Sequence, residues 1–466
     1  MKRLFLFLVS RFGLFAISLG LGMVSYLVVQ ELGAEEKAEA ARMNPNSFAA
    51  LPAGITLDAE PHLLARTESP VDAAGDALGI FYILQADGDV VRVAPEVGGG
   101  TAATPYASFA DERTETSIGF SSLALHPNFL RKDQPGFGRF YVVVAERAGV
   151  KPVDFLPEFG GGSEHHQGVV YEYTVDDPLL TEFRGIRREL MRFSQPGPDH
   201  NLRGLTFDPQ GLLYLGVGDG AAAEVGGNSP SRNASSLTSA YGKVLRINPL
   251  GMDSLNGQYG IPDGNPFRLV SGSLPELWVF GLRAPQSLSY DPFLRGLCIA
   301  ERASPGLEEI NLSLNGGEHF GWDIAEDAAR LGRSARARLA EVVTAPTVSL
   351  DLRLGLVSRT SGSVVYRGEN FPSLAGALLL ASHDGQLLAL RSGEATGPRG
   401  HLAKIDLGRF SEQRFSALRS GPRGELIFLC EDGRVFEMRK SASLGTGGSK
   451  HRSLFCNAGL SEDDRG

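Results

Sequence analysis

The stretch PDHNLRGLTFDPQGLLYLGVGDG, residues 198–220, contains two apolar runs separated by the turn sequence Asp-Pro-Gln-Gly. Proline sets φ for the first central position of a β-turn, and glycine often follows it. The pattern therefore predicts a β-hairpin. His200 precedes its first strand and Asp219 follows its second strand. Because a hairpin returns the chain to its starting point, we expect the two side chains to face the same space, as parts of a reaction site or of a turn.

Similar signals recur along the chain. Apolar runs end in Asp-Gly tips, as in IFYILQADGDVVRV, LLLASHDGQLLAL and IFLCEDGRVFEM, or follow turns, as in DPFLRGLCIAE and GPRGELIFLCED. Asp-Gly between apolar runs is a strong hairpin signal, because both residues accept positive φ. Six regions carry one or both signals, near residues 80, 126, 208, 291, 378 and 421. Such uneven repetition of one unit predicts an all-β fold, a six-bladed β-propeller with large loop insertions.

A β-sandwich and a βαβ fold are the competing interpretations. A sandwich needs fewer and more regular strands, and a βαβ fold needs helices between its strands. Residues 323–343 are the one stretch of the body with the pattern of a helix of any length. The 58 glycines and 26 prolines among 466 residues suit short strands joined by turns. The propeller is therefore the favoured fold.

Charge and cysteine content exclude several classes of protein. The net charge of −9 argues against nucleic acid as a partner, since phosphate binding needs a basic surface. Three cysteines without CxxC spacing form neither a disulfide framework nor a zinc site, and Cys298 and Cys430 are expected to be buried in strands. The sequence contains no P-loop, HExxH, GxSxG or dinucleotide-binding motif.

The amino-terminal segment predicts attachment to a membrane. Basic residues precede 18 apolar or small residues, and an acidic stretch follows them. This charge order places the amino end in the cytoplasm and the body outside it, in the periplasm or beyond. An uncleaved anchor helix is favoured over a cleaved signal peptide, and both export the body. The expected organisation is an anchor at 1–30, a linker at 31–50, a propeller at 51–440 and a disordered tail at 441–466.

Five motifs in order resemble those of the glucose/sorbosone dehydrogenase family. They are GFSSLALHPNF, DHNLRGLTFDPQGLLYLGVGDG, YGKVLRINP with IPDGNPF, PELWVFGLRAPQSLSYDP and EEINLSLNGGEHFGWD. The resemblance covers roughly residues 115–440 and implies a six-bladed propeller that uses pyrroloquinoline quinone (PQQ) and Ca²⁺. It also implies oxidation of an aldose sugar at C1 to the lactone. Electrons would then pass to a quinone or cytochrome of the membrane.

The resemblance assigns catalytic roles to three residues. His200 occupies the position of the general base, which suits an imidazole because its ordinary pKa of ~6.5 lies near neutrality. Arg283, in GLRAPQS, matches the arginine that steadies the quinone oxygen as negative charge develops there. Asp219 matches an aspartate of the family, and we expect its carboxylate to orient the imidazole.

Further residues are assigned to the cofactor and to calcium. The cofactor-binding positions are Gln286, Arg414 and His383, where His383 stands in place of a lysine of the family. The calcium positions are Ala303, Ser304 and Glu309, where the first two stand in place of a glycine–proline pair whose carbonyl groups hold the ion. Backbone carbonyls survive a change of side chain, so this substitution alone does not remove the metal loop.

Four departures from the family pattern affect the cofactor site. They are Ala284 for an asparagine, His383 for the lysine, Ser416 for a second arginine, and the Ala303–Ser304 pair. Loss of cations weakens the binding of a cofactor with three carboxylates, and each hydrogen bond to a charged group contributes roughly 1.5–3 kcal/mol. Arg203, Arg302 and Arg359 are candidates to replace the lost cations.

These departures keep other functions open. A propeller with a degenerate cofactor site would be a non-catalytic module that binds a carbohydrate or a protein. A calcium-dependent lactonase would need carboxylates that converge on the central axis, and the sequence shows no ordered set of them. The resemblance favours the dehydrogenase.

Overall fold

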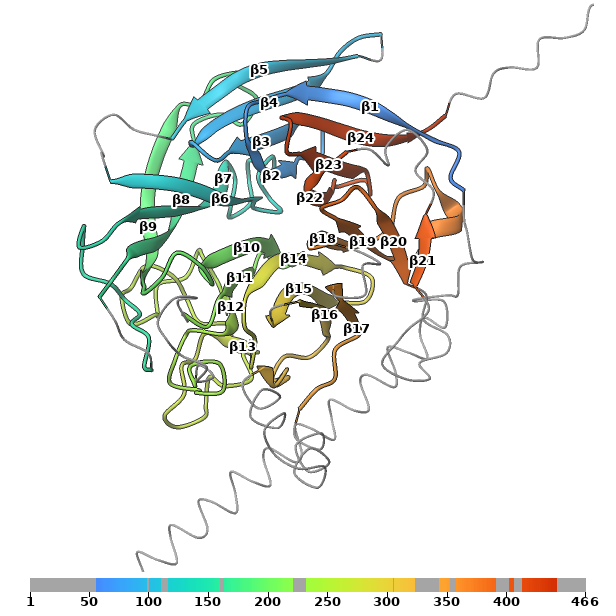
Figure 1. Ribbon diagram of the computed structural model, residues 1–466. Coiled ribbons are helices and arrows are strands. Elements are labelled where there is room, and N and C mark those ends of the chain that lie inside the picture. The colour runs from blue at the N-terminus through green and yellow to red at the C-terminus, as the bar shows by residue number, and fades with distance from the viewer. Residues whose placement is uncertain are drawn as a thin grey trace, which may run out of the picture.

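The protein is a ring of six four-stranded antiparallel sheets around a central axis (Figure 1). The computed structural model describes residues 56–98, 100–109, 116–159, 163–220, 232–304, 306–322, 343–352, 358–390, 402–405 and 413–441. The prediction of an all-β, six-bladed propeller is confirmed. The expected anchor, linker, helix and tail at 1–30, 31–50, 323–343 and 441–466 lie almost entirely outside the described residues.

From the axis outward, the strands of each blade follow in chain order, except that β1 is the outermost strand of blade 6. Blade 1 consists of β2 (Pro70–Gly75), β3 (Phe81–Gln85), β4 (Asp89–Pro95) and β5 (Thr101–Ser108). Blade 2 consists of β6 (Ser117–Leu125), β7 (Arg139–Arg147), β8 (His166–Val175) and β9 (Gly185–Gln195). Blade 3 consists of β10 (Leu202–Phe207), β11 (Leu213–Val217), β12 (Lys243–Ile247) and β13 (Leu277–Phe280). Blade 4 consists of β14 (Pro285–Asp291), β15 (Gly296–Ser304), β16 (Leu307–Ser313) and β17 (Val348–Asp351). Blade 5 consists of β18 (Thr360–Val365), β19 (Leu378–Ser382), β20 (Leu387–Leu390) and β21 (Leu402–Ile405). Blade 6 consists of β22 (Phe415–Ser420), β23 (Leu426–Cys430), β24 (Arg434–Lys440) and β1 (Ala59–Arg66). A short 3₁₀ helix, η2 (Pro372–Leu374), lies between β18 and β19.

The ring is closed by strands from both ends of the described chain. In blade 6, β1 pairs antiparallel with β24, from Ala59 opposite Lys440 to Arg66 opposite Arg434. The first described strand thus completes the sheet that the last three strands begin (Figure 1). Closure of this kind gives every blade a neighbour on both faces, which stabilises the ring.

The core lies between the blades. Six clusters of buried apolar side chains occur in the described residues, and each joins two neighbouring sheets. The second strand of a blade therefore buries residues on both faces, as Leu213–Val217 does, and appears in the sequence as a continuous apolar run rather than an alternating one. Cys298 and Cys430 are free thiols buried in this core, as predicted. Each fully buried large apolar side chain contributes about 1.5–3 kcal/mol.

The two kinds of turn signal fall on opposite faces of the ring. The Asp-Pro-Gln-Gly turn at 208–211 joins an inner strand to the second strand, whereas the Asp-Gly turn at 384–385 joins a second strand to a third. Since the strands alternate in direction, the Asp-Gly turns between second and third strands lie on the same face as the connections that enter each inner strand. We call this the loop face, and the other the turn face.

Each inner strand shifts its register near its first residues. The skipped residues include Ser121, Ser361 and Ser416. Their hydroxyl groups donate to backbone carbonyls of the next inner strand, Ser121 to Leu202, Ser361 to Phe415 and Ser416 to Pro70, at 3.4, 2.5 and 3.1 Å. A bulge re-aims a side chain, and here it links neighbouring blades close to the axis.

No helix within the described part of the chain is long and apolar enough to cross a membrane. The predicted anchor precedes the first described residue, so it stays a prediction.

Candidate active site

His200 lies on the loop face in a backbone conformation that side chains seldom adopt. Its φ is +57°, and among the described residues only Arg295 is another non-glycine residue with positive φ. Histidine is one of the residue types enriched there, and such strain clusters at functional sites. Gly218 permits this conformation, because a Cβ at that position would lie 1.9 Å from the His200 carbonyl oxygen.

The His200 imidazole is paired with the Asp219 carboxylate. Nδ1 of His200 lies 2.7 Å from Oδ1 of Asp219, and both residues are buried. A carboxylate can only accept in this pair, so Nδ1 carries the proton and Nε2 of the neutral ring keeps its lone pair. The hairpin expected from the sequence therefore brings the His200 imidazole and the Asp219 carboxylate together.

Trp322 is a third member of this arrangement, and no role was expected for it from the sequence. Its indole Nε1–H donates to Oδ2 of Asp219 at 2.9 Å. The segment 317–322 runs beside β13, where the amides of Phe320 and Trp322 donate to the carbonyls of Phe280 and Gly281. The signal was the motif GGEHFGWD, whose tryptophan lies 103 positions from Asp219.

Arg283 joins the same group from the connection between β13 and β14. Its guanidinium lies over the Trp322 ring, 5.1 Å from the centroid, and its carbonyl accepts the amide of Asp219 at 2.8 Å. Its own amide donates to Glu301 Oε2 at 2.8 Å. The structure thus connects His200, Asp219, Trp322 and Arg283 on one face, while their chemical roles stay predictions.

The predicted calcium positions lie at the loop-face end of β15 and beside it in β16. Ala303 is buried, Ser304 ends the strand, and Glu309 pairs in register with Glu301. Burial raises the pKa of Glu301 to about 8, with the neighbouring Glu309 carboxyl adding to the effect, and burial raises the pKa of Glu309 to about 7. No cluster of three His, Cys, Asp or Glu side chains that could hold a metal occurs in the described residues. Calcium binding at these positions stays a prediction.

The predicted cofactor positions differ in their surroundings. Gln286 is the skipped residue of β14, and its amide donates to the Ala284 carbonyl at 3.1 Å. Arg414 is exposed just before β22. His383, in the β19–β20 turn, is bound through Nε2 to Glu431 of the neighbouring blade. All three residues lie on the loop face. His383, which stands in place of the family lysine, is already bound to the carboxylate of Glu431.

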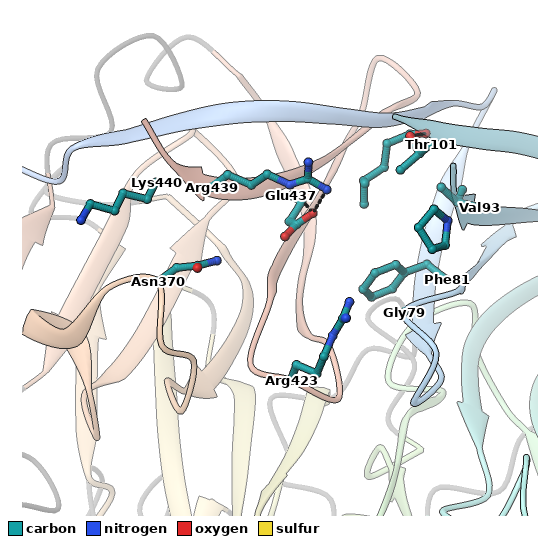
Figure 2. A pocket seen from close by; sticks show the side chains of 11 residues that line it. Gly79, Phe81, Val93, Thr101, Asn370, Arg423, Glu437, Arg439 and Lys440 are labelled. Carbon is teal, nitrogen blue, oxygen red and sulfur yellow. Dashed lines mark hydrogen bonds and ion pairs between the residues drawn. The ribbon is translucent and has the colours of Figure 1, made fainter. Parts of the chain in front are cut away.

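A pocket elsewhere contains none of the predicted residues. It lies between blades 6 and 1, away from the axis, and has a volume of about 360 Å³ (Figure 2). Arg423 projects into it from the β22–β23 turn, on the turn face, and its guanidinium is paired with Glu425 at 2.7 Å. Arg439 is likewise paired with Glu437 (Figure 2). These two cations are neutralised within the protein.

Comparison with protein families and curated proteins identifies relatives of this chain. A family model described as Glucose / Sorbosone dehydrogenase matches residues 78–437. Aldose sugar dehydrogenase YliI of Escherichia coli (strain K12) is 26% identical over 278 residues, which are 59% of this chain and 68% of that protein. The HIPL1 protein of Arabidopsis thaliana is 26% identical over 275 residues, which are 52% of this chain and 37% of that protein. The chain thus spans little more than a third of the HIPL1 length.

Solved structures share the fold. The apo-form of the soluble aldose sugar dehydrogenase from Escherichia coli superposes with a TM-score of 0.58 at 20% identity, covering 82% of this chain and 99% of that one. The holo form of the PQQ domain of pyranose dehydrogenase from Coprinopsis cinerea gives a TM-score of 0.52 at 13% identity, covering 84% and 100%. At these identities the likeness shows the propeller alone.

Proposed function

Because the chain belongs to the glucose/sorbosone dehydrogenase family, we propose that it oxidises an aldose sugar at C1 to the lactone with PQQ as the acceptor. The name of the Escherichia coli relative and the PQQ domain of the Coprinopsis structure support this proposal. The observation that carries it is the contact of His200 with Asp219, extended by Trp322 to Arg283, on the loop face.

His200 removes the proton of the C1 hydroxyl group. Nε2 accepts this proton, while Nδ1–H remains bound to Asp219, so the imidazolium that forms is stabilised by a carboxylate 2.7 Å away. The C1 hydrogen leaves as hydride while the C1–O bond becomes a carbonyl. PQQ, if bound, would supply the two-electron acceptor for this hydride.

Arg283 holds a fixed positive charge beside the base. Its guanidinium is positioned by the Trp322 ring and by the Arg302 carbonyl, which lies 3.5 Å from Nη1. A preorganised cation stabilises negative charge that develops during a reaction, because it needs no reorganisation at that moment. Gln286 and Arg414 add hydrogen-bond donors on the same face, so the residues present fit a polycarboxylate quinone.

The calcium, the electron acceptor and the location belong to the same proposal. Calcium would be held by the carbonyl groups of Ala303 and Ser304 with Glu309 nearby, and no step of the mechanism depends on it. The body would lie outside the cytoplasm, tethered by residues 1–30, and pass electrons to a membrane quinone or cytochrome.

A second function is favoured by the contacts that two of the cofactor positions already make within the protein. His383 is already bound to Glu431, and Ser416 donates to Pro70 rather than presenting a cation. A propeller that kept the scaffold and lost the cofactor would bind a carbohydrate or a protein without oxidising it.

Reconstitution separates the two functions. The purified chain is mixed with PQQ and Ca²⁺ at micromolar concentration, and quinone absorbance and aldose-dependent dye reduction are followed. The dehydrogenase predicts a spectral change and dye reduction that depends on sugar, with His200→Ala as the inactive control. No spectral change with folded protein would reject the oxidation and favour the binding module.

A further inference from the structure

Four arginines from four blades gather around the central axis. Arg203 lies on β10, Arg302 on β15, Arg359 directly before β18 and Arg419 on β22. Burial within the ring lowers the pKa of Arg203, and the neighbouring guanidinium groups of Arg419, Arg359 and Arg302 lower it further, while Asp72 opposes them. Arg203, Arg302 and Arg359 lie at the loop-face ends of their strands, and Arg203 is close enough to the other three for their charges to act on it. We call the four residues the axial arginines.

Arg419 extends across the axis. Its Nε lies 2.5 Å from Oδ1 of Asp72 in blade 1, and its Nη1 lies 3.3 Å from Oγ of Ser287 in blade 4. Blades 1 and 4 are opposite each other in the ring of six. Arg419 thus places a positive charge at the centre of the ring.

The carboxylates near the axis do not balance the arginines. Asp72 is occupied by Arg419, and Glu308 lies 3.6 Å from Arg302 and also accepts a hydrogen bond from Thr360. Within the described part of the chain, neither Arg203 nor Arg359 forms an ion pair. The side chains of Arg203 and Arg359 are both exposed, although the ring restricts the hydration of Arg203. The positive charges of Arg203 and Arg359 therefore have no carboxylate partner among the described residues, although other arginines lie near them.

This excess charge lies at the level of the candidate active site. Arg203 follows Leu202 where β10 shifts its register, which is the position that Gln286 holds in β14 and Ser416 in β22. The backbone of Arg359 is also part of the loop face, because its carbonyl accepts the amide of His383 at 2.7 Å. The unpaired cations thus adjoin the positions assigned to the cofactor, where the family lysine and arginine are absent.

We propose that Arg203 and Arg359, backed by Arg302 and Arg419, bind the carboxylate groups of an anionic ligand at the loop-face end of the axis. This inference rests on the proposed function to the extent that it takes the tricarboxylate quinone as that ligand. The planar guanidinium fork matches a carboxylate in two parallel hydrogen bonds. The axial arginines then supply, from inside the ring, the cations that His383 and Ser416 do not supply from their own positions.

Direct binding to the full chain tests the proposal without relying on activity. Dissociation constants are measured by calorimetry for PQQ and for benzene-1,3,5-tricarboxylate, with no sugar present. We expect Arg203→Gln and Arg359→Gln each to weaken binding of both ligands about tenfold to a hundredfold. Arg203→Lys keeps the charge but not the fork and should lie between Arg203→Gln and the unchanged chain. Arg423→Gln, on the turn face, is the matched control and should bind as the unchanged chain does.

The outcomes separate the inference from the proposed function. If PQQ binds the unchanged chain and both glutamine variants equally, the inference is wrong and the dehydrogenase stands. If PQQ does not bind but the tricarboxylate binds in a manner that needs Arg203, the dehydrogenase fails and the anion site stands. If neither ligand binds the folded, unchanged chain, both are overturned. Circular dichroism of each variant checks that a loss of binding is not a loss of fold.

Discussion

Two buried histidines at opposite faces of the propeller show how one residue type is put to different uses. His200 lies just before an inner strand, on the loop face, and His126 lies just after one, on the turn face. His200 contacts a carboxylate through Nδ1, whereas Nδ1 of His126 accepts the backbone amide of Asn128 at 3.0 Å. The ring nitrogen Nδ1 thus acts as a donor to a carboxylate in His200 and as an acceptor of a backbone amide in His126.

The surroundings of His126 enforce its neutral form. Burial lowers its pKa to about 4, and the positive charge of Arg139 contributes, while Glu172 opposes the shift. Its ring also fills space that Gly136 and Gly211 leave open, since a Cβ at either glycine would collide with it. Burial alone therefore does not distinguish the two histidines, whereas the partner of Nδ1 does.

Replacement of His200 should have the largest effect on activity. His200→Ala removes the base, and general-base catalysis contributes about 10²–10⁴-fold to a rate. We expect kcat for aldose oxidation to fall about 10³-fold, with PQQ binding retained. His126→Gln is the matched control and should keep kcat. Equal losses in both variants would mean that the comparison reports stability rather than chemistry.

Asp219→Asn should have the next largest effect. Asparagine offers one acceptor and one donor, so it favours the tautomer in which Nε2 carries the proton and is no longer a base. Loss of an orienting partner of this kind costs about 10–100-fold in activity, and we expect kcat to fall while KM changes little. The control is Asp208→Asn, at the turn of the same hairpin, which should lower stability and leave kcat unchanged. A drop in kcat for Asp208→Asn would remove the distinction between the faces.

The hairpin that carries Asp208 and Asp219 shows how much could be predicted from the local sequence. Asp-Pro-Gln-Gly and Asp-Gly are local signals, so the hairpins and the closeness of His200 to Asp219 follow from short-range turn chemistry. Arg283 lies in the connection from this blade to the next, and only the resemblance to a family connects it to them. The positive φ of His200 depends on Gly218 and Asp219 around it, which no periodicity reveals.

Two further features depend on register and on long-range packing. Ser416 stands in place of an arginine of the family, and the register shift in β22 makes its hydroxyl a link to the carbonyl of Pro70. A one-residue shift re-aims a side chain and leaves the apolar pattern almost unchanged, so this link has no signature in the sequence. Trp322 reaches Asp219 only because segment 317–322 returns along β13.

The neutral His126 predicts a loss of stability in acid. A histidine in the unfolded chain takes up a proton near pH 6.5, but this one resists it until about pH 4. The unfolded state therefore binds more protons between these values, so the contribution is full above pH 6.5 and is lost as the pH falls toward 4. Between pH 8 and pH 5 the unchanged chain should lose about 2 kcal/mol more than His126→Gln.

Urea unfolding at pH 8, 6.5 and 5 measures this difference. Other buried histidines, such as His166, whose pKa is also lowered to about 4 by burial, contribute equally to both proteins and cancel. Parallel stability profiles for the two proteins would show that His126 is protonated in the fold and that the turn face does not hold it neutral.

Trp322→Phe should have the smallest of these effects, and it tests how far the loop-face arrangement extends beyond the hairpin. Phenylalanine keeps an aromatic ring beneath the Arg283 guanidinium but loses the Nε1–H that Asp219 Oδ2 accepts at 2.9 Å. Asp219 still binds His200, so the carboxylate becomes freer to rotate rather than lost. We expect kcat to fall about tenfold, as for one hydrogen bond to a charged group. The pH dependence of kcat should also shift, because the carboxylate supports the imidazolium less well.

Trp322→Leu removes the aromatic ring as well, and a larger loss of kcat in this variant would show that the position of Arg283 also depends on the ring. If Trp322→Phe keeps both the rate and the pH profile, the hairpin alone positions the base, and Trp322 serves only to seat Arg283.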